Sequence, residues 1–250
     1  MSILRPSIVK VKSIYNYLIE PATELPPTID MAVVFGRKSR HLAHAAIATA
    51  RRAERLFVTG ETGKDSGDNP RFGISESAYL LSAISFAGVG LSRVSVDPYH
   101  PKNGVDNARN TMRMVREIEG VTAIGTLVGV MHSTQTRRLG LTLATEAERG
   151  GIIVDTLSLC ASPYPFDPYN RFDQNEAAFE IVRMDELARE GVFARPEGLD
   201  KHLPYATDLL KYHQERFKAE NPPILNPSTA DNTLRTVHPD ELQAMYLQNK

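Results

Sequence analysis

Short apolar runs alternate with helical stretches over much of the chain. Five runs are apolar almost throughout, which is typical of strands buried on both faces: residues 31–36, 56–58, 93–97, 123–130 and 152–157. Between them the pattern predicts helices at residues 42–53, 75–86, 106–119 and 134–149. Strands that alternate with helices indicate a parallel sheet covered on both sides. We therefore predict an α/β fold with a doubly wound, Rossmann-like parallel sheet of about five strands.

The chain on either side of this sheet is predicted to be helical. A leading amphipathic helix is expected over residues 6–20, and the prolines that follow it break the helix. After an aromatic and proline-rich connector, Phe179, Val182 and Leu187 define one face of a second helix. The helices expected after the connector cover residues 175–190, 205–220 and 239–247.

These patterns divide the chain into three parts. Residues 1–29 form an N-terminal helix and linker, residues 30–160 the Rossmann-like α/β domain, and residues 161–250 a helical C-terminal subdomain. We expect the N-terminal helix and the C-terminal appendage to pack together against the edge or mouth of the sheet.

Ligands of open parallel sheets bind beyond the carboxyl ends of the strands. Glycine and polar residues follow four of the predicted strands, and the fold would bring them together although they are distant in sequence. These candidate ligand-binding residues are Gly36, Arg37, Thr59, Gly60, Glu61, Thr62, Gly63, Glu76, Asp97, Asn103, Asp106, Asn107, His132, Arg137 and Arg138.

The segment from Thr59 to Gly63 ends a strand in a glycine-containing loop. Glycine lets the backbone turn tightly and approach a ligand, and backbone N–H groups there can hold an anion. A plain tight turn is the alternative, because the segment matches neither the Walker pattern nor the full dinucleotide fingerprint. Glu61 would repel a phosphate, so a ribose, a positive centre or a bound cation suits this loop better. The polar loop at residues 64–73 is long enough to cover such a site.

The segment from Asn103 to Asn107 brings two amides and a carboxylate to the start of a helix. It reads either as a turn in which Asp106 caps the helix or as a set of hydrogen-bonding groups for a ligand. The positive charge of Arg37, Arg137 or Arg138 would neutralise an anionic ligand.

Glu76 and His132 are the candidate catalytic residues. Glu76 lies in the first turn of its predicted helix, where the helix dipole alone also favours an acid. His132 follows a predicted strand and is either a structural histidine or an acid–base group. No Gly-x-Ser-x-Gly elbow is present, which excludes the usual serine hydrolase. His41 and His44 lack a neighbouring acidic partner, so we predict no metal site.

The composition argues against several classes of partner and of structural site. A formal net charge of −1 gives no electrostatic reason to expect nucleic acid or an anionic membrane surface. The single cysteine, Cys160, allows neither an intramolecular disulfide nor a cysteine-based zinc site. The chain shows no secretory signal and no stretch of the roughly 20 apolar residues that a membrane span needs. We expect a cytoplasmic protein.

The ordered set of strand-end segments resembles the YdcF-like family, a bacterial group that also contains the SanA and ElyC envelope proteins. Residues 30–37 resemble the family's opening strand ending in glycine, and residues 58–63 are similar to its second strand with a Ser/Thr-Gly-Gly-type loop. Ser75-Glu76-Ser77 resembles the family's Ser-Glu-Ala. Residues 103–107 resemble its Asn-Thr-x-Glu-Asn, with Gly104 replacing Thr and Asp106 replacing Glu.

The likeness covers roughly residues 30–148 and has two departures. Glu61 stands where many members have glycine, and the usual histidine followed three residues later by arginine is stretched to His132 and Arg137-Arg138. The resemblance implies a Rossmann-like sheet with a polar pocket at its carboxyl edge and a nucleotide-like ligand. S-adenosylmethionine is among the candidates for that ligand. Without a membrane segment, the chain resembles the soluble members more than the anchored ones.

Three functions remain open. The first is binding of a small nucleotide-like or anionic metabolite at the carboxyl edge of the sheet. The second is a transferase or hydrolase acting on a nucleotide or phosphorylated compound, with acid–base groups from Glu61, Glu76, Asp97 and His132 and with or without a divalent cation. The third is a non-catalytic interaction module, in which the connector at residues 164–172 and the C-terminal helices form an interface such as that of a homodimer.

Overall fold

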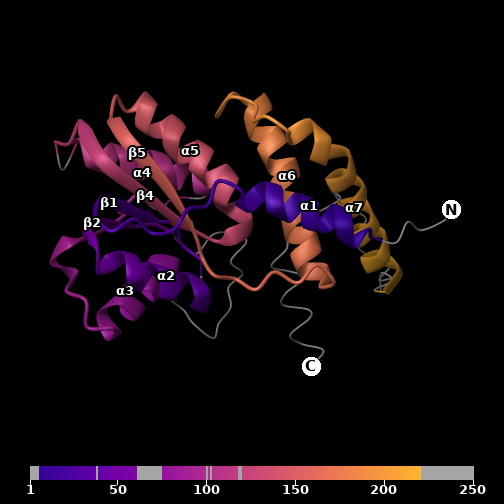
Figure 1. Ribbon diagram of the computed structural model, residues 1–250, viewed down its shortest axis with the longest axis horizontal. Coiled ribbons are helices and arrows are strands. Elements are labelled where there is room, and N and C mark those ends of the chain that lie inside the picture. Colours follow the sequence, from indigo (N-terminus) through magenta and orange to yellow (C-terminus); the bar gives the residue numbers. More distant parts are fainter. Residues whose placement is uncertain are drawn as a thin grey trace, which may run out of the picture.

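The computed structural model describes residues 6–37, 39–60, 75–99, 101, 103–117 and 120–220. Its centre is a five-stranded, all-parallel sheet in the order β3-β2-β1-β4-β5 (Figure 1). The strands are β1 (Ile29–Val34), β2 (Ala53–Val58), β3 (Val94–Val96), β4 (Ala123–Met131) and β5 (Ile153–Ala161). The predicted Rossmann-like fold class is confirmed.

Helices cover both faces of the sheet, which explains why the inner strands β1 and β4 are mostly buried and apolar. Alternate residues of a strand point to opposite faces. Val34 of β1 joins the apolar cluster beneath α2 (Arg40–Ala50) and α3 (Glu76–Phe86). Val33, its neighbour, joins the cluster beneath α4 (Gly104–Glu117) and α5 (Thr136–Arg149). Figure 1 shows these two helix pairs on opposite sides of the sheet.

The chain changes sides between two adjacent strands. After β1 it continues into α2 on one face, and after β4 it continues into α5 on the other. These strands pair in parallel, with Val34 beside Val130. Their carboxyl ends therefore diverge at a topological switch point, which is where open α/β sheets bind ligands.

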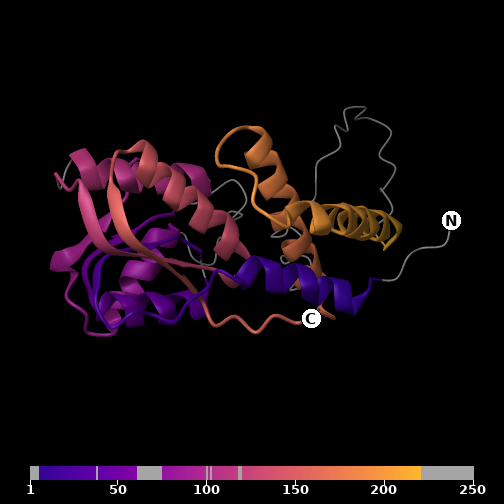
Figure 2. The ribbon, with the colours of Figure 1, turned by 45° about the horizontal axis from the view of Figure 1, so that its top comes forward.

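A separate helical layer lies beside the sheet, at the carboxyl end of β4. It consists of α1 (Ile8–Ile19), α6 (Arg171–Arg189) and α7 (Leu199–Glu220), which share one apolar cluster (Figures 1 and 2). Both α1 and α6 contact the short segment Ser133–Gln135 that follows β4. Helices from the N-terminal and the C-terminal parts of the described chain thus meet next to the switch point.

The buried face of α6 agrees only in part with the predicted one. Leu187 is buried and the half-buried Val182 packs against the same cluster, whereas Phe179 is outside it, and Ile181 and Met184 form further buried contacts. The helix begins earlier than predicted, at Arg171, because the side chain of Asn170 accepts a hydrogen bond from the Phe172 N–H at 2.9 Å.

The start of the second helix of the appendage also differs from the prediction. Helix α7 begins at Leu199, before the predicted start, and contains Pro204. The helix predicted at residues 239–247 and the covering loop predicted at residues 64–73 lie outside the described residues.

Candidate functional site

The loops that follow β1 and β2 pack backbone against backbone. A Cβ atom built on Gly36 would lie 2.3 Å from the carbonyl oxygen of Thr59, and one built on Gly60 would lie 2.7 Å from the Cα of Gly36. Gly60 also has a φ of +113°, which L-residues rarely adopt. The Ser77 N–H donates to the carbonyl of Gly60 at 3.0 Å and brings Glu76 against this contact. The structure therefore joins four predicted site residues: Gly36, Thr59, Gly60 and Glu76.

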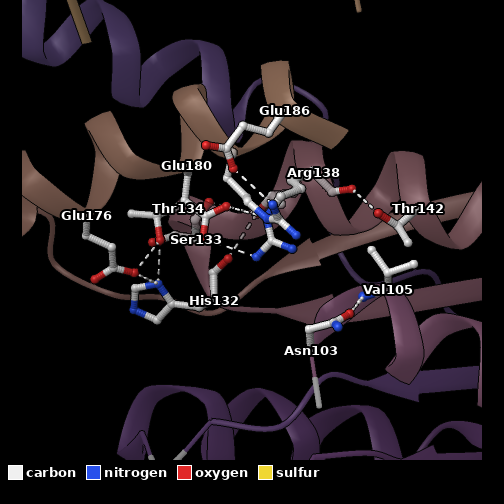
Figure 3. Close-up of polar contacts among 12 residues, drawn as sticks. Asn103, Val105, His132, Ser133, Thr134, Arg138, Thr142, Glu176, Glu180 and Glu186 are labelled. Atoms are coloured by element: carbon white, nitrogen blue, oxygen red, sulfur yellow. Dashed lines mark hydrogen bonds and ion pairs between the residues drawn. The ribbon is translucent and has the colours of Figure 1, made fainter. Parts of the chain in front are cut away.

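Arg37, His132, Thr134 and Glu176 form a polar group that we call the strand-end cluster. Arg37 follows β1, whereas His132 and Thr134 follow β4, and Glu176 reaches them from α6. The Arg37 guanidinium donates two hydrogen bonds to Glu176, Nη1 to Oε1 at 2.5 Å and Nη2 to Oε2 at 3.1 Å. Figure 3 shows the side chains of His132, Thr134 and Glu176 pointing toward one another.

Hydrogen bonds within the strand-end cluster define which nitrogen of His132 carries the proton. Thr134 Oγ1 donates to Glu176 Oε1 at 2.6 Å, so its only hydrogen is used. Its oxygen lies 2.9 Å from Nδ1 of His132 and must accept that bond, while Glu176 Oε1 lies 3.2 Å from the same nitrogen. Nδ1 therefore carries the hydrogen, and Nε2 keeps its lone pair. In Figure 3 this second nitrogen lies on the side of the ring away from Thr134.

Burial and charge act on both titratable members of the cluster. Burial lowers the pKa of His132, which is 2% exposed, and the positive charge of Arg37 lowers it further, so the neutral ring is favoured. Burial alone would raise the pKa of Glu176. The Arg37 charge and the hydrogen bond with His132 outweigh burial and hold this pKa well below its usual range. A neutral imidazole thus lies beside an ionised carboxylate.

Tyr164 and Asp173 form one wall of the cluster. The Tyr164 ring centroid lies 4.6 Å from that of His132. Its hydroxyl donates to Asp173 Oδ1 at 2.6 Å, and Asp173 Oδ2 accepts from the Asp167 N–H at 2.7 Å. Burial and the hydrogen bond to Asp173 raise the pKa of Tyr164, and burial raises the pKa of Asp173. Tyr164 therefore remains a hydroxyl donor across the physiological pH range.

Arg138 and Glu180 form a second buried ion pair between α5 and α6. Arg138 donates from Nε at 2.5 Å and from Nη2 at 3.2 Å to the two oxygens of Glu180. Glu180 lies one helical turn beyond Glu176 (Figure 3). Helix α6 therefore presents two carboxylates along one face, one to Arg37 and one to Arg138. A Cβ atom on Gly104 would lie 3.0 Å from Arg138 Nη1, which brings the start of α4 close to this pair.

Arg137 is directed away from the strand ends, toward α1. Its Nε donates to the carbonyl of Tyr17 at 2.7 Å, its Nη2 pairs with Glu20, and its guanidinium lies 4.1 Å from the centroid of the Tyr17 ring. These contacts tie α1 to α5. The arginine that we grouped with the site residues thus has a structural contact on the other side of its helix.

The start of α4 corrects the predicted cap. Asn103, not Asp106, caps this helix, because its Oδ1 accepts hydrogen bonds from the N–H groups of Val105 at 2.9 Å and Asp106 at 3.0 Å. Asn103 lies directly before the first residue of the helix, so its side chain can fold back onto the free N–H groups of the first turn. Asp106 already lies inside that turn. Asp97 is similarly engaged, since it accepts from the Tyr99 N–H at 2.8 Å and from Asn110 Nδ2 at 3.1 Å.

Two predicted site residues carry buried polar atoms without a partner in the described part of the chain. These are Thr59 Oγ1 and Asn107 Oδ1. A buried polar atom without a hydrogen bond is costly, so such atoms are natural contact points for water or a ligand. Glu61, Thr62 and Gly63 lie outside the described residues.

Sequence reasoning missed the residues that α6 and the connector contribute: Tyr164, Asp173, Glu176 and Glu180, together with Thr134. A signal was present, because Asp173, Glu176 and Glu180 recur with the spacing of one helical face. The same face carries buried alanines, and buried carboxylates on such a face need cationic partners.

The three candidate arginines each have a carboxylate partner: Glu176 for Arg37, Glu20 for Arg137 and Glu180 for Arg138. An anionic ligand would have to compete with these carboxylates. Within the described ranges, no group of three or more His, Cys, Asp or Glu side chains could hold a metal ion. Nor is any helix of those ranges long and apolar enough to cross a membrane.

In comparisons with known proteins, no protein-family model matches the chain, and no curated protein matches it at a significant level. The resemblance to the YdcF-like family therefore stays a prediction. We base the functional proposal on the geometry of the strand-end residues.

Proposed function

We propose that the protein binds a small nucleotide-like molecule at the carboxyl edge of the sheet, between the ends of β1, β2 and β4 and helix α6. The observation that carries this proposal is the strand-end cluster itself, a buried polar group at the switch point of a doubly wound sheet. The close contact of Gly36 with Gly60 supports it, because this packing fixes the end of β1, and with it Arg37, against the end of β2.

Because Arg37 is paired with Glu176, the site favours a ligand that contacts it through hydroxyl groups or a positively charged group. Arg37 is engaged by Glu176, so a phosphate gains little there unless the carboxylate gives way. Nε2 of His132 can accept a hydrogen bond from a ribose hydroxyl, and the carboxylate of Glu76, next to Gly36 and Gly60, suits a positive centre. S-adenosylmethionine combines a ribose with a sulfonium and is the first compound to test.

Glu176 and Glu180 provide a matched pair of variants for this test. Either Glu→Gln change leaves an arginine without its carboxylate. Arg138 is buried and the Arg37 side chain is 22% exposed, so the unfolding free energy should fall by about 3–5 kcal/mol in Glu180→Gln and by less in Glu176→Gln. Only Glu176→Gln also disturbs the proton position of His132. We expect S-adenosylmethionine or a ribonucleoside to raise the melting temperature of the wild type at micromolar concentration. Affinity should fall about tenfold in Glu176→Gln but not in Glu180→Gln.

Two results would contradict the proposal. One is the absence of any ligand-induced shift in melting temperature up to millimolar concentration. The other is an equal loss of affinity in both variants, which would show that general destabilisation, not the strand-end cluster, is responsible. Isothermal titration calorimetry of the two folded variants separates these cases.

A second candidate function is a transferase or hydrolase in which His132 acts as the general base. The observation that favours it is the orientation of the ring, with Nδ1–H directed at Thr134 and Glu176 and the lone pair left on Nε2. Because its pKa is lowered, His132 is neutral and able to accept a proton at pH 7. On this view His132→Gln should abolish turnover of a nucleotide substrate, while the variant still melts cooperatively and binds the ligand more weakly than the wild type. A variant that retains full turnover would exclude this role.

A further inference from the structure

A recess lies between the start of α1, the start of α6 and the last turns of α7. We call it the helical recess, and it is lined by Tyr169, Arg171, Gln174, Tyr212, His213 and Arg216, among others. Its volume is about 380 Å³, within the range of small-molecule sites. Gln174 and Glu176 are two residues apart on α6, which turns their side chains ~200° from each other. The helical recess and the strand-end cluster therefore occupy nearly opposite sides of the same helix.

Buried polar atoms without partners line this recess. Gln174 is 4% exposed and His213 is 3% exposed. In the described part of the chain neither Gln174 Oε1 nor either ring nitrogen of His213 has a hydrogen-bond partner. The Gln174 amide is oriented by the bond from its Nε2 to the carbonyl of Pro168 at 2.7 Å, which leaves Oε1 as an acceptor. Each such unpaired atom costs about 1–3 kcal/mol, so a bound group that satisfied them would be stabilising.

The interior of the recess is polar but uncharged. Burial lowers the pKa of His213 to about 4, with the positive charges of Arg171 and Arg216 adding to the effect. At neutral pH its ring therefore offers one N–H donor and one acceptor, and Gln174 adds a second acceptor. Donors and acceptors side by side on neutral groups match the edge of a planar nitrogen heterocycle or amide. They do not favour an ion.

The rim of the recess carries positive charge. Glu220 accepts a hydrogen bond from Arg171 Nη1 at 2.8 Å and another from Arg216 Nε at 2.7 Å. The chain's own carboxylate thus already lies between the two guanidiniums, which shows that the rim fits an anionic group. Two cations facing one carboxylate leave one positive charge in excess. Tyr169, 72% exposed, adds a flat aromatic surface to the rim.

We propose that the helical recess binds a planar heteroaromatic molecule that carries one phosphate or carboxylate. The ring lies toward Gln174 and His213, and the anionic group lies at Arg171 and Arg216. This site is independent of the strand-end cluster, because none of its polar groups belongs to that cluster.

The chain has no tryptophan, so Tyr169→Trp introduces a single fluorescent reporter at the rim. We would titrate this variant with the four ribonucleoside 5′-monophosphates, with nicotinate and, separately, with inorganic phosphate. At least one of the five heteroaromatic anions should give a saturable change with half-saturation below ~1 mM. Inorganic phosphate alone should bind at least ~10-fold more weakly, because it cannot reach the interior groups.

Further variants in the Tyr169→Trp background locate the binding. Gln174→Leu and His213→Phe should each weaken it by ~10-fold, since each replaces a buried hydrogen-bonding group by an apolar one of similar size. Glu220→Gln should tighten it by ~3-fold to 10-fold, because it removes the carboxylate that competes for the arginines. Glu176→Gln alters the strand-end cluster and should leave this titration unchanged, which separates the two proposals.

Every variant is first checked for a cooperative melting transition, and His213→Phe replaces Gln174→Leu if the latter does not fold. Three results would overturn the proposal. They are no response to any of the five ligands at ~5 mM, wild-type affinity in the interior variants, and equal affinity for inorganic phosphate alone. Wild-type affinity in the interior variants, or equal affinity for inorganic phosphate, would mean that the rim arginines alone bind the ligand. The unpaired interior atoms would then be hydrogen-bonded to water.

Discussion

Two buried histidines in this protein have different surroundings but the same charge at neutral pH. His132 has its Nδ1 proton held by Thr134 and Glu176, whereas His213 has no hydrogen-bond partner in the described part of the chain. Burial is the main cause of a lowered pKa at both residues, and a neighbouring arginine adds to it. The carboxylate beside His132 only partly offsets these effects. Each ring is thus a neutral hydrogen-bonding group, and only His132 has its tautomer defined by its neighbours.

The lowered pKa of His213 makes the stability of the fold depend on pH. The unfolded chain binds a proton at this residue below pH ~6.5, but the folded protein does so only near pH 4. The stability that depends on the neutral ring is complete above pH 6.5 and is lost as pH falls from 6.5 toward 4. Linkage at ~1.4 kcal/mol per pKa unit gives a loss of ~3 kcal/mol over this window.

His213→Phe should therefore flatten the pH dependence. Urea unfolding at pH 7 and pH 4.5 measures the difference in unfolding free energy for the wild type and the variant. We expect a smaller difference in His213→Phe, by ~2–3 kcal/mol. The contribution of His132 is common to both proteins and cancels. His44→Gln changes an exposed histidine and should keep the wild-type difference, and equal pH dependence in all three proteins would contradict the prediction.

At the scale of single elements, the sequence predicts the sheet better than it predicts the helical layer. Strands such as β1 are buried by helices on both sides, so their apolar runs and flanking glycines indicate them directly. Helix α6 mixes apolar contacts with buried Asp173, Glu176 and Glu180 on its inner side. A hydrophobic pattern treats those carboxylates as solvent-facing, because only their partners reveal that they are buried: arginines for Glu176 and Glu180, and Tyr164 for Asp173. For this reason the predicted face of α6 was right for Leu187 and Val182 but did not include the buried carboxylates.

The same difference applies to the candidate site: the sequence predicts its residues at the strand ends better than those on α6. Residues that follow strands, such as Gly36, Gly60 and His132, could be proposed because the fold itself brings strand ends together. Glu176 could not, since it pairs with Arg37 across 139 residues of sequence. No local pattern connects two residues that far apart. The helical spacing of Asp173, Glu176 and Glu180 places this carboxylate on one face, but it does not identify Arg37 as its partner.

The contact of the β1 and β2 loops gives a prediction at this scale. Gly36→Ala places a methyl group 2.3 Å from the Thr59 carbonyl, and because that atom belongs to the backbone of a neighbouring strand end, the loops must separate. We expect a loss of about 1–3 kcal/mol of unfolding free energy, as for other overpacked sites. Ligand affinity at the strand ends should fall as well.

Gly90→Ala is the matched control for this change. A Cβ on Gly90 meets nothing within 4 Å, and its backbone has a φ of −63° and a ψ of 135°, which alanine adopts freely. This variant should be neutral or slightly stabilising, because alanine reduces the entropy of the unfolded chain. Denaturant unfolding of both variants gives the comparison. Equal stability of the two would show that the loops can separate without cost.

On the scale of the whole molecule, polar bridges attach the helical layer to the sheet domain. The layer has its own apolar cluster, built from α1, α6 and α7. Three arginines of the sheet domain reach into it: Arg37 and Arg138 pair with α6, and Arg137 contacts the end of α1. The first two belong to or adjoin the strand-end cluster. Because the bridges to α6 lie beside the proposed ligand site, the position of this helix and ligand binding should be coupled.

A substitution of Arg137 tests how α1 is attached to the sheet domain and leaves the strand-end cluster unchanged. Its Nε satisfies the carbonyl of Tyr17, one of the free carbonyls in the last turn of α1, and its charge lies over the Tyr17 ring at 4.1 Å. Arg137→Ala removes both contacts and the ion pair with Glu20. We expect the free energy of local opening of α1 to fall by about 1–2 kcal/mol, which accelerates amide exchange there by ~5-fold to 30-fold.

Hydrogen exchange measured by mass spectrometry resolves this change by segment. Peptides of α1 should exchange faster in Arg137→Ala, while those of β1 and β4 keep wild-type rates, since their core contacts are intact. Arg183→Ala is the control, because Arg183 pairs with Glu186 along the half-buried side of α6 and such pairs contribute ~0–1 kcal/mol. Unchanged exchange in α1 would mean that its apolar contacts with α6 hold it alone. Faster exchange in α1, β1 and β4 together would mean that the two layers open as one unit.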